Sequence, residues 1–411
     1  MPFRLNHYVT EWYQYRFIPD DAREKKFFYL DKTPAVVVRD GHRYKRNELL
    51  RWGPNSCFYQ RDLYTTRFGE QESTKIEEEF FGPIDFAGKA AVEYIAGFQH
   101  PSVNHDAIPN LLKYMSVQKM RTPKGLAAFA EFVGAPNQNA TLQRMMQLHQ
   151  IHCATWTEAV WSILDASESP TKFIISDNPV TVYNSGCFPE SKWCREFRDP
   201  DIRMIGSHTL FPLGLDKLLV LTNLNWARDP YSDPVKLRTN PALFHEAMFS
   251  FLAIQTQRVL TEREVRLVNH IIKSRALRYV AAAEKAWLYP EQEFAGVRWD
   301  KLADPYLLMP DPRSMTFSGG IAFGGGGVAG AFNEYGIQPG QPGYEDQKRF
   351  DREWAAFHAF QGEFARLHGP RRRGRAMEMA DHFSPVEDTP EWHKTLLGYE
   401  ARNKAQIRKR K

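Results

Sequence analysis

The sequence predicts an α+β fold that is mainly α-helical and carries a small antiparallel sheet. Three observations lead to this fold class. Apolar residues recur at helical spacing between 73 and 164, four short apolar runs separated by turns lie between 172 and 223, and a long amphipathic stripe follows Thr261. Of the 411 residues, 43% are hydrophobic and 25% are charged, which is the composition of an ordinary globular protein.

Charge and cysteine content argue against several classes of protein. Lys and Arg number 54 against 49 Asp and Glu, and the resulting charge of +5 is too small to predict nucleic-acid or membrane binding by itself. The four cysteines form no C-x-x-C pair, so neither a disulfide framework nor a zinc ribbon is indicated. The chain contains no signal-peptide pattern and no run of about 18 apolar residues. We therefore expect a cytoplasmic protein without membrane contact.

The first seventy residues are expected to form short strands. FFYL at 27–30 and AVVV at 35–38 are rich in aromatic and β-branched residues, which favour strands. Asp40-Gly41 follows the second run and is a turn pair typical of hairpins.

Helical spacing replaces this pattern from Ser73 to Ile95, and Pro83 is expected to kink that helix. Further helices are expected at 108–118, 124–133 and 140–164.

Strands of the small sheet are expected next, and a long helix is expected to close the domain. The predicted strands are 172–176, 180–183, 209–213 and 218–223. Thr261 and Glu264 have the spacing of a capping box, in which each side chain bonds the backbone N–H of the other residue. Apolar residues at 3-4-4-3-4 spacing continue behind them to Ala283.

Composition divides the chain into a main domain at 1–290, a Pro/Gly-rich linker region at 291–345, and a C-terminal aromatic helix with a basic tail at 346–411. The helix is expected at 344–368. The Gly-rich segment 319–330 lacks the pattern of a phosphate-binding loop. The basic residues that could contact nucleic acid or a protein partner are Arg371, Arg372, Arg373, Arg375, Arg408, Lys409, Arg410 and Lys411. A solvated tail is the alternative.

Several sequence blocks occur in an order that identifies a family. The first is NHYVTEWYQYRF at 6–17, and the others are Ile76-Glu77 with Ile84-Asp85, Tyr114 to Gln118 with Arg121-Thr122-Pro123, Phe173 to Val180, and Leu210 to Leu213 with Leu218 to Leu221. Together with Asn269 and Ala276 to Val280, these blocks resemble a bacterial family of unknown function, domain-of-unknown-function family 4238, over about residues 6–283. Thr10 replaces the usual Pro of the first block. The resemblance supplies a boundary and a short list of residues, but no reaction.

Polar residues within the matched blocks are the candidates for a site. Ser176-Asp177-Asn178 lie at a turn between two predicted strands, where they could act as acid, base or ligand, or could form an Asx-turn. Gln118 and Arg121 share a helix face and could clamp an anion. The alternative for Arg121 is a structural ion pair with Glu77 or Asp85.

The best functional hypothesis from these residues is one polar pocket that binds, and could hydrolyse, a phosphate-bearing substrate such as a nucleotide or nucleic acid. Arg121 would hold the anion, Asp177 or Glu77 would act as base or hold a hydrated divalent metal, and His7 would be the acid. Gln118, Ser176 and Asn178 would bind the substrate. His7 has the alternative of a hydrogen-bonded core residue. The competing hypothesis is a non-enzymatic interaction protein that uses the C-terminal helix and basic tail.

Overall fold

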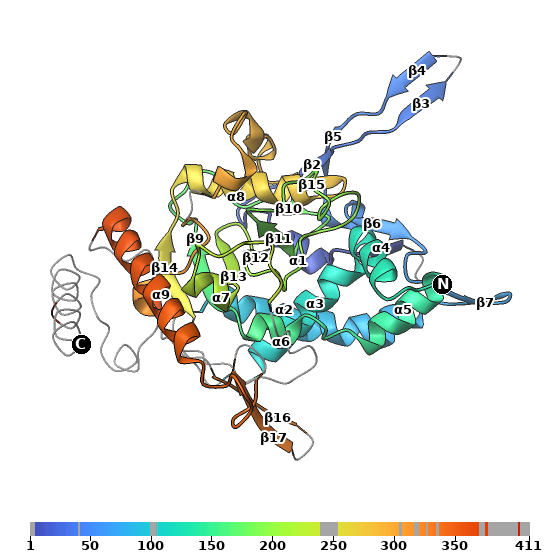
Figure 1. Ribbon diagram of the computed structural model, residues 1–411. Coiled ribbons are helices and arrows are strands. Elements are labelled where there is room, and N and C mark those ends of the chain that lie inside the picture. Colours follow the sequence, from blue (N-terminus) through green and yellow to red (C-terminus); the bar gives the residue numbers. More distant parts are fainter. Residues whose placement is uncertain are drawn as a thin grey trace.

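We describe the protein from a computed structural model, which is shown in Figure 1. The structure describes residues 5–39, 42–98, 104, 106–238, 254–303, 306–315, 320–325, 328–333, 337–369, 375–376 and 402. Within these residues, two β-sheets and a group of helices share one hydrophobic core, whose members extend along the chain from Tyr8 to Leu308.

The larger sheet is mixed and lies at the centre of the molecule (Figure 1). Its strands are β9 (Val160–Asp165), β11 (Thr181–Asn184), β12 (Ser207–Pro212), β13 (Lys217–Thr222), β14 (Gln255–Val259) and β18 (Arg375–Ala376). They are hydrogen-bonded in the order β11-β12-β13-β9-β14-β18, and only the β14–β9 pair is parallel among the pairs described. All residues of β11 and β12 are buried, so the sheet is covered on both faces there.

The second sheet joins the two ends of the main domain. Its strands are antiparallel in the order β10-β15-β2-β5 and span β10 (Ile175–Ser176), β15 (Tyr279–Ala282), β2 (Phe27–Asp31) and β5 (Leu49–Trp52). Tyr279 pairs with Asp31, and the Arg278 guanidinium donates to both oxygens of Asp31 at 2.9 and 2.7 Å. Residues about 250 positions apart are therefore adjacent in this sheet.

Four two-stranded antiparallel sheets complete the described β-structure. They are formed by β1 (Leu5–His7) with β6 (Tyr59–Arg61), β3 (Val36–Arg39) with β4 (His42–Lys45), β7 (Thr66–Phe68) with β8 (Gln71–Ser73), and β16 (Gly320–Gly325) with β17 (Val328–Asn333). All but the β1–β6 pair are hairpins. The β3–β4 and β16–β17 hairpins project from opposite sides of the molecule (Figure 1).

The described helices are α1 (Glu11–Tyr15), the π-helix η2 (Ile76–Phe81), α2 (Gly82–Ala96), α3 (Ala107–Arg121), α4 (Pro123–Phe132), α5 (Gln138–Gln147), α6 (Cys153–Thr157), α7 (Leu224–Arg228), α8 (Glu262–Arg275) and α9 (Gln347–His368). In Figure 1, α2 to α6 lie together on one side of the sheets, α8 lies on the opposite side, and α9 lies along one edge of the molecule. Short 3₁₀ turns span Pro54–Ser56, Lys285–Leu288, Pro290–Gln292, Trp299–Lys301 and Pro312–Ser314. None of the described helices combines the length and the apolar character needed to span a bilayer.

The joint between α3 and α4 requires a glycine. Thr122 has extended backbone and its hydroxyl accepts the N–H of Gly125 at 3.0 Å, while Pro123 occupies the first helical position. A Cβ on Gly125 would lie 1.9 Å from the carbonyl oxygen of Lys119. This close approach brings the end of α3 against the start of α4, and it places Lys119 and Lys124 near each other.

The fold-class prediction is wrong in its balance of elements, because the described residues contain several sheets, one of them large and mixed, in place of one small antiparallel sheet. Two predicted helices end early and strands replace their last turns. The helix expected at 140–164 is α5, α6 and then β9, and the helix expected to reach Ala283 ends at Arg275 before β15. Buried strands are apolar on both faces, so their short runs cannot be told from helix by periodicity.

Other predicted features are confirmed. Thr261 and Glu264 form the capping box at the start of α8. The helix expected from Ser73 to Ile95 is present as η2 followed directly by α2, and Pro83 lies in the first turn of α2. The Asp40-Gly41 turn and, of the basic residues, Arg371 to Arg373 and Arg408 to Lys411 lie outside the described residues.

The C-terminal aromatic helix docks on the main body (residues 5–315). Phe357, Phe360 and Phe364 of α9 are buried in a small cluster with Tyr306 and Met309. Trp226 and Met315 pack against the edge of this cluster. The C-terminal half of α9 is therefore covered by the same chain.

Candidate functional site

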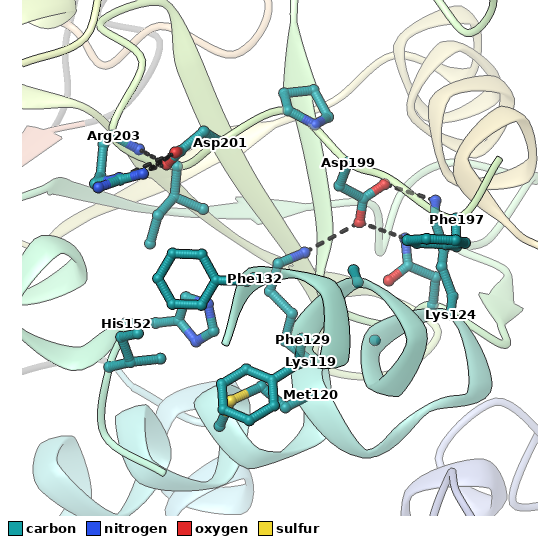
Figure 2. Close-up of a pocket in the computed structure, with 16 residues that line it drawn as sticks. Lys119, Met120, Lys124, Phe129, Phe132, His152, Phe197, Asp199, Asp201 and Arg203 are labelled. Atoms are coloured by element: carbon teal, nitrogen blue, oxygen red, sulfur yellow. Dashed lines mark hydrogen bonds and ion pairs between the residues drawn. The ribbon is translucent and has the colours of Figure 1, made fainter. Parts of the chain in front are cut away.

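A pocket of about 230 Å³ lies beside the joint between α3 and α4, under the loop that contains Asp199 (Figure 2). We call it the lysine pocket, after Lys119 and Lys124. The other lining residues are Met120, Gly125, Ala128, Phe129, Phe132, Ile151, His152, Asn178, Phe197, Asp199, Pro200, Asp201, Ile202 and Arg203.

Asp199 holds the polar end of the lysine pocket together. Its two oxygens accept from Lys124 Nζ at 2.6 Å and from Lys119 Nζ at 3.0 Å. The Asn178 amide donates to the second oxygen at 3.0 Å. Burial disfavours the charge of Asp199, but Lys124 and Lys119 hold the pKa of its carboxyl well below the usual range. Asp199 is therefore ionised throughout the physiological pH range.

The charges that line the pocket leave a positive excess. Lys119, Lys124 and Arg203 are cationic, and Asp199 and Asp201 are the carboxylates that line it. Arg203 bonds Asp201, with Nε at 2.9 Å from Oδ1, on the other side of the pocket from Asp199 (Figure 2). One positive charge remains, and it belongs to the lysine pair.

Aromatic and aliphatic side chains form the remaining wall. Phe129 is buried, whereas Phe132 is 58% exposed, and their ring centroids are 6.4 Å apart. Phe197, Ile151 and Ile202 also line the pocket. The pocket thus has an apolar wall next to a cationic end.

His152 contributes a neutral polar group to this pocket. Its Nδ1 lies 3.0 Å from the Ser116 hydroxyl, and its ring stacks on Trp156 at 5.2 Å. Burial, with a further contribution from Lys119, lowers the pKa of His152 to about 3. The imidazole can therefore give or take a hydrogen bond, but it carries no charge near neutral pH.

The predicted site residues do not gather around this pocket. Of the seven, Asn178 lines it. Asn178 Nδ2 bonds Asp199 and the Arg275 carbonyl, and its backbone N–H donates to the buried Ser176 hydroxyl at 3.2 Å. Ser176 thus orders the turn that presents Asn178 to the pocket.

Asp177 points away from this turn into the second sheet. Its carboxylate accepts the backbone N–H groups of Leu277, Arg278 and Tyr279 at 2.8, 2.6 and 2.7 Å. Burial raises the pKa of Asp177, and the three backbone donors oppose this shift. The carboxylate therefore fixes the backbone between the end of α8 and the start of β15.

Arg121 and Gln118 belong to another buried network. Arg121 Nη1 donates to Asp85 at 2.9 Å, Nε donates to Gln118 Oε1 at 2.9 Å, and the guanidinium is 1% exposed. It lies over the rings of Phe81 and Tyr114 at 5.5 and 5.8 Å. Gln118 in turn donates to the Tyr8 carbonyl at 2.7 Å. These contacts engage Arg121 on all sides within the core.

Glu77 is beside this network, and His7 is not in contact with it. Asn6 Nδ2 donates to Glu77 at 3.1 Å, and burial raises the pKa of Glu77 to about 7 despite the lowering effect of Arg121. His7 follows Asn6 in strand β1, so its side chain leaves the opposite face. There Nδ1 lies 3.5 Å from Glu11 and the ring lies 5.8 Å from Tyr59.

The network of Asp85, Gln118 and Arg121 and the lysine pocket use different faces of α3. Successive helical residues point about 100° apart, so Gln118 and Lys119 face different surroundings. Sequence reasoning missed Lys119, Lys124 and Asp199, although both lysines lie in or beside the block from Tyr114 to Pro123. Asp199 comes from a loop that is distant in the sequence, and no local sequence pattern marks it as a site residue. Within the part of the chain that the structure describes, no group of three or more His, Cys, Asp or Glu is placed to hold a metal.

Comparisons with known proteins identify the family. A family model described as "Protein of unknown function (DUF4238)" matches residues 6–286, and the chain belongs to this family. The resemblance found in the sequence blocks is thereby confirmed. Comparisons with curated proteins and with solved structures gave no match.

Proposed function

We propose that this member of the DUF4238 family binds a small phosphate-bearing molecule with a flat apolar group in the lysine pocket. The observation that carries the proposal is the convergence of two ammonium groups, Lys119 and Lys124, at one end of a cavity with aromatic walls. Such a site combines an apolar lining with a few convergent polar groups, which is the usual character of a small-molecule site. Its volume of about 230 Å³ fits one ring system with one phosphate.

The lysines retain capacity for an anion. An ammonium group has three N–H donors. Lys119 contacts Asp199 and, at 3.4 Å, the Val180 carbonyl, and Lys124 contacts Asp199 and, at 2.7 Å, the Arg275 carbonyl. These contacts use two donors of each ammonium group, so a phosphate oxygen can accept the third from both.

Asp199 limits the negative charge of the anion that the pocket can bind. Its permanent negative charge offsets one lysine, so the pocket holds one net positive charge and favours a ligand with a single phosphate over a polyphosphate. Phe129, Phe132 and Phe197 provide ring faces for the apolar group of the ligand.

The proposal is for binding without hydrolysis. A general base needs a pKa near the operating pH, whereas Asp199 and His152 both titrate far below neutrality. Glu77, with a pKa of about 7, belongs to a different network.

Isothermal titration calorimetry of the full chain with phenyl phosphate tests the proposal. Lys119→Met should weaken binding about tenfold or more, because a charge-assisted hydrogen bond contributes about 1.5–3 kcal/mol. Lys89→Met is the matched control, since Lys89 is exposed on α2 and does not line the pocket. Circular dichroism and thermal melting would confirm that both variants fold.

A second pair of variants tests the aromatic wall. Phe132→Ala should weaken binding about threefold to tenfold through lost ring contact, whereas Phe86→Ala, which removes an 83% exposed ring on α2, should leave it unchanged. Benzyl alcohol should not bind. Equal losses in Lys119→Met and Lys89→Met, or binding of benzyl alcohol as strong as that of phenyl phosphate, would contradict the proposal.

A further inference from the structure

Three sulfur-bearing side chains meet in the segment between β11 and β12. Cys187 and Met204 are in contact, with 3.8 Å between the Cys187 Sγ and the Met204 Sδ. Cys194 belongs to the same buried group, and its Sγ lies 3.7 Å from the Cys187 carbonyl oxygen. The two thiols also lie within hydrogen-bonding reach of each other. We call these three residues the cysteine–methionine cluster.

Tight turns hold the backbone of the cysteine–methionine cluster. In each of its three residues, the backbone N–H donates to the carbonyl oxygen of the residue three positions earlier, at 3.0 or 3.1 Å. Trp193 and Val235 pack against the cluster. Cys194 is 7% exposed, so a small ion can reach the sulfurs from outside. The three sulfurs are therefore held together before any ligand binds.

The types of ligand and their spacing suit a soft metal ion. Thiolate and thioether sulfurs select copper(I) among the common metal ions. A bond between sulfur and a first-row metal such as zinc is about 2.3 Å long, which puts two sulfurs on one ion about 3.8–4.0 Å apart. The distance of 3.8 Å between the sulfurs of Cys187 and Met204 falls within this range. The cluster can thus close on an ion without a large movement of these two side chains.

A buried guanidinium lies next to the two thiols. Arg275 Nη2 donates to the Cys187 carbonyl, and the guanidinium also lies within hydrogen-bonding reach of the Cys194 thiol. Arg275 is 2% exposed, and its Nε has no hydrogen-bond partner within the described part of the chain. The guanidinium lies over the Trp299 ring at 4.7 Å. The carboxylate of Asp199, which acts on it, is already held by the lysine pair.

This guanidinium decides between metal ions by charge. Copper(I) with two thiolates and a neutral thioether carries one negative charge, which the positive charge of Arg275 balances. Zinc(II) with the same ligands is neutral and leaves the guanidinium without a counter-charge. Structural zinc sites also take four protein ligands, whereas the cluster offers three.

We propose that the cysteine–methionine cluster binds one copper(I) ion through the sulfurs of Cys187, Cys194 and Met204. Both thiols lose their protons to solvent when the ion binds. The third ligand is a thioether, so the site differs in kind from a group of His, Cys, Asp or Glu. It shares no ligand with the lysine pocket and does not depend on the function proposed for that pocket.

Competition for copper(I) between the reduced full chain and a colour-forming copper(I) chelator, without oxygen, tests the proposal. Cys194→Ser should weaken copper(I) binding about a hundredfold or more, because loss of a residue that merely orients a metal ligand already costs about 10–100-fold. Cys153→Ser is the matched control, since it removes a free cysteine outside the cluster. It should leave the affinity unchanged.

A second pair of variants tests the thioether. Met204→Leu conserves the side-chain volume, so it keeps the test valid if Cys194→Ser does not fold. It should weaken copper(I) binding about tenfold or more. Met146→Leu, at a 36% exposed position on α5, is the control and should have no effect. X-ray absorption of the copper-loaded chain should show three sulfur neighbours at about 2.3 Å.

Three results would overturn the proposal. Equal losses in Cys194→Ser and Cys153→Ser would show that copper(I) binds any thiol of the chain. Unchanged affinity in Met204→Leu, or nitrogen and oxygen neighbours in place of sulfur, would contradict the set of ligands. Displacement of copper(I) by an equal concentration of zinc(II) would contradict the choice of ion.

Discussion

Replacement of Asp177 by alanine should lower the free energy of unfolding markedly, because this side chain holds the segment between α8 and β15 in place by hydrogen bonds. Its carboxylate is buried and accepts three consecutive backbone N–H groups, from Leu277 to Tyr279. Beyond these donors, β15 pairs with β10 and β2 of the second sheet. Loss of the carboxylate therefore weakens the attachment of a strand that links both ends of the main domain.

The contacts set the magnitude of this effect. A hydrogen bond to a charged acceptor contributes about 1.5–3 kcal/mol, and a buried donor left without a partner costs about 1–3 kcal/mol. Three donors lose their acceptor in Asp177→Ala, so we expect the free energy of unfolding to fall by about 4 kcal/mol or more. Asp177→Asn keeps one oxygen acceptor and should cost less than the alanine variant.

Urea denaturation followed by far-ultraviolet circular dichroism measures this loss. Asp21→Ala is the matched control, because Asp21 is exposed, and it should change the free energy by no more than about 0.5 kcal/mol. A loss below about 1 kcal/mol for Asp177→Ala would refute the structural reasoning. Such a small loss would mean that Asp177 is not needed for the fold and could act in a functional site.

Three other predictions concern the buried network and the joint between α3 and α4. The folded pKa of Glu77, about 7, exceeds its ordinary value of 4.5, so its stabilising contribution is present below pH 4.5 and is lost as pH rises through 7. Between pH 5 and 8 the free energy of unfolding, measured by urea denaturation, should thus fall less in Glu77→Gln than in the wild type, by an amount on the order of 3 kcal/mol, and parallel profiles would contradict this. Asp85→Asn should lower the free energy of unfolding by about 3–5 kcal/mol, because it leaves the Arg121 guanidinium buried without its counter-charge. An unchanged free energy in the same assay would show that the hydrogen bonds to Gln118 are enough to hold Arg121. Gly125→Ala should lower the melting temperature and weaken phenyl phosphate binding, since its Cβ would lie 1.9 Å from the Lys119 carbonyl; unchanged values would show that the joint relaxes freely.

The sequence predicted those elements whose signal is local. The capping box of Thr261 and Glu264 needs only four residues, and it is present at the start of α8. Strand β9 was missed because its buried residues follow helical segments without a turn residue that marks the change. The second sheet was missed because β15 pairs with β2 across most of the chain, and no local pattern reports such a pairing.

The candidate site shows the same division between local and distant signals. Polar residues in the family's blocks proved to be buried and bonded to each other or to backbone groups, as for Arg121 with Asp85 and Asp177 with the start of β15. The lysine pocket depends on Asp199, which reaches Lys119 and Lys124 from a loop about 75 residues later in the chain. Only the folded chain brings these three charges together.

The most direct measurement of the central claim is a crystal structure of the protein soaked with phenyl phosphate. We expect the phosphate oxygens at about 2.7–2.9 Å from Nζ of both Lys119 and Lys124, with the ring against Phe129 and Phe132. Clear density for the ligand elsewhere, with the lysine pocket occupied only by water, would contradict the claim.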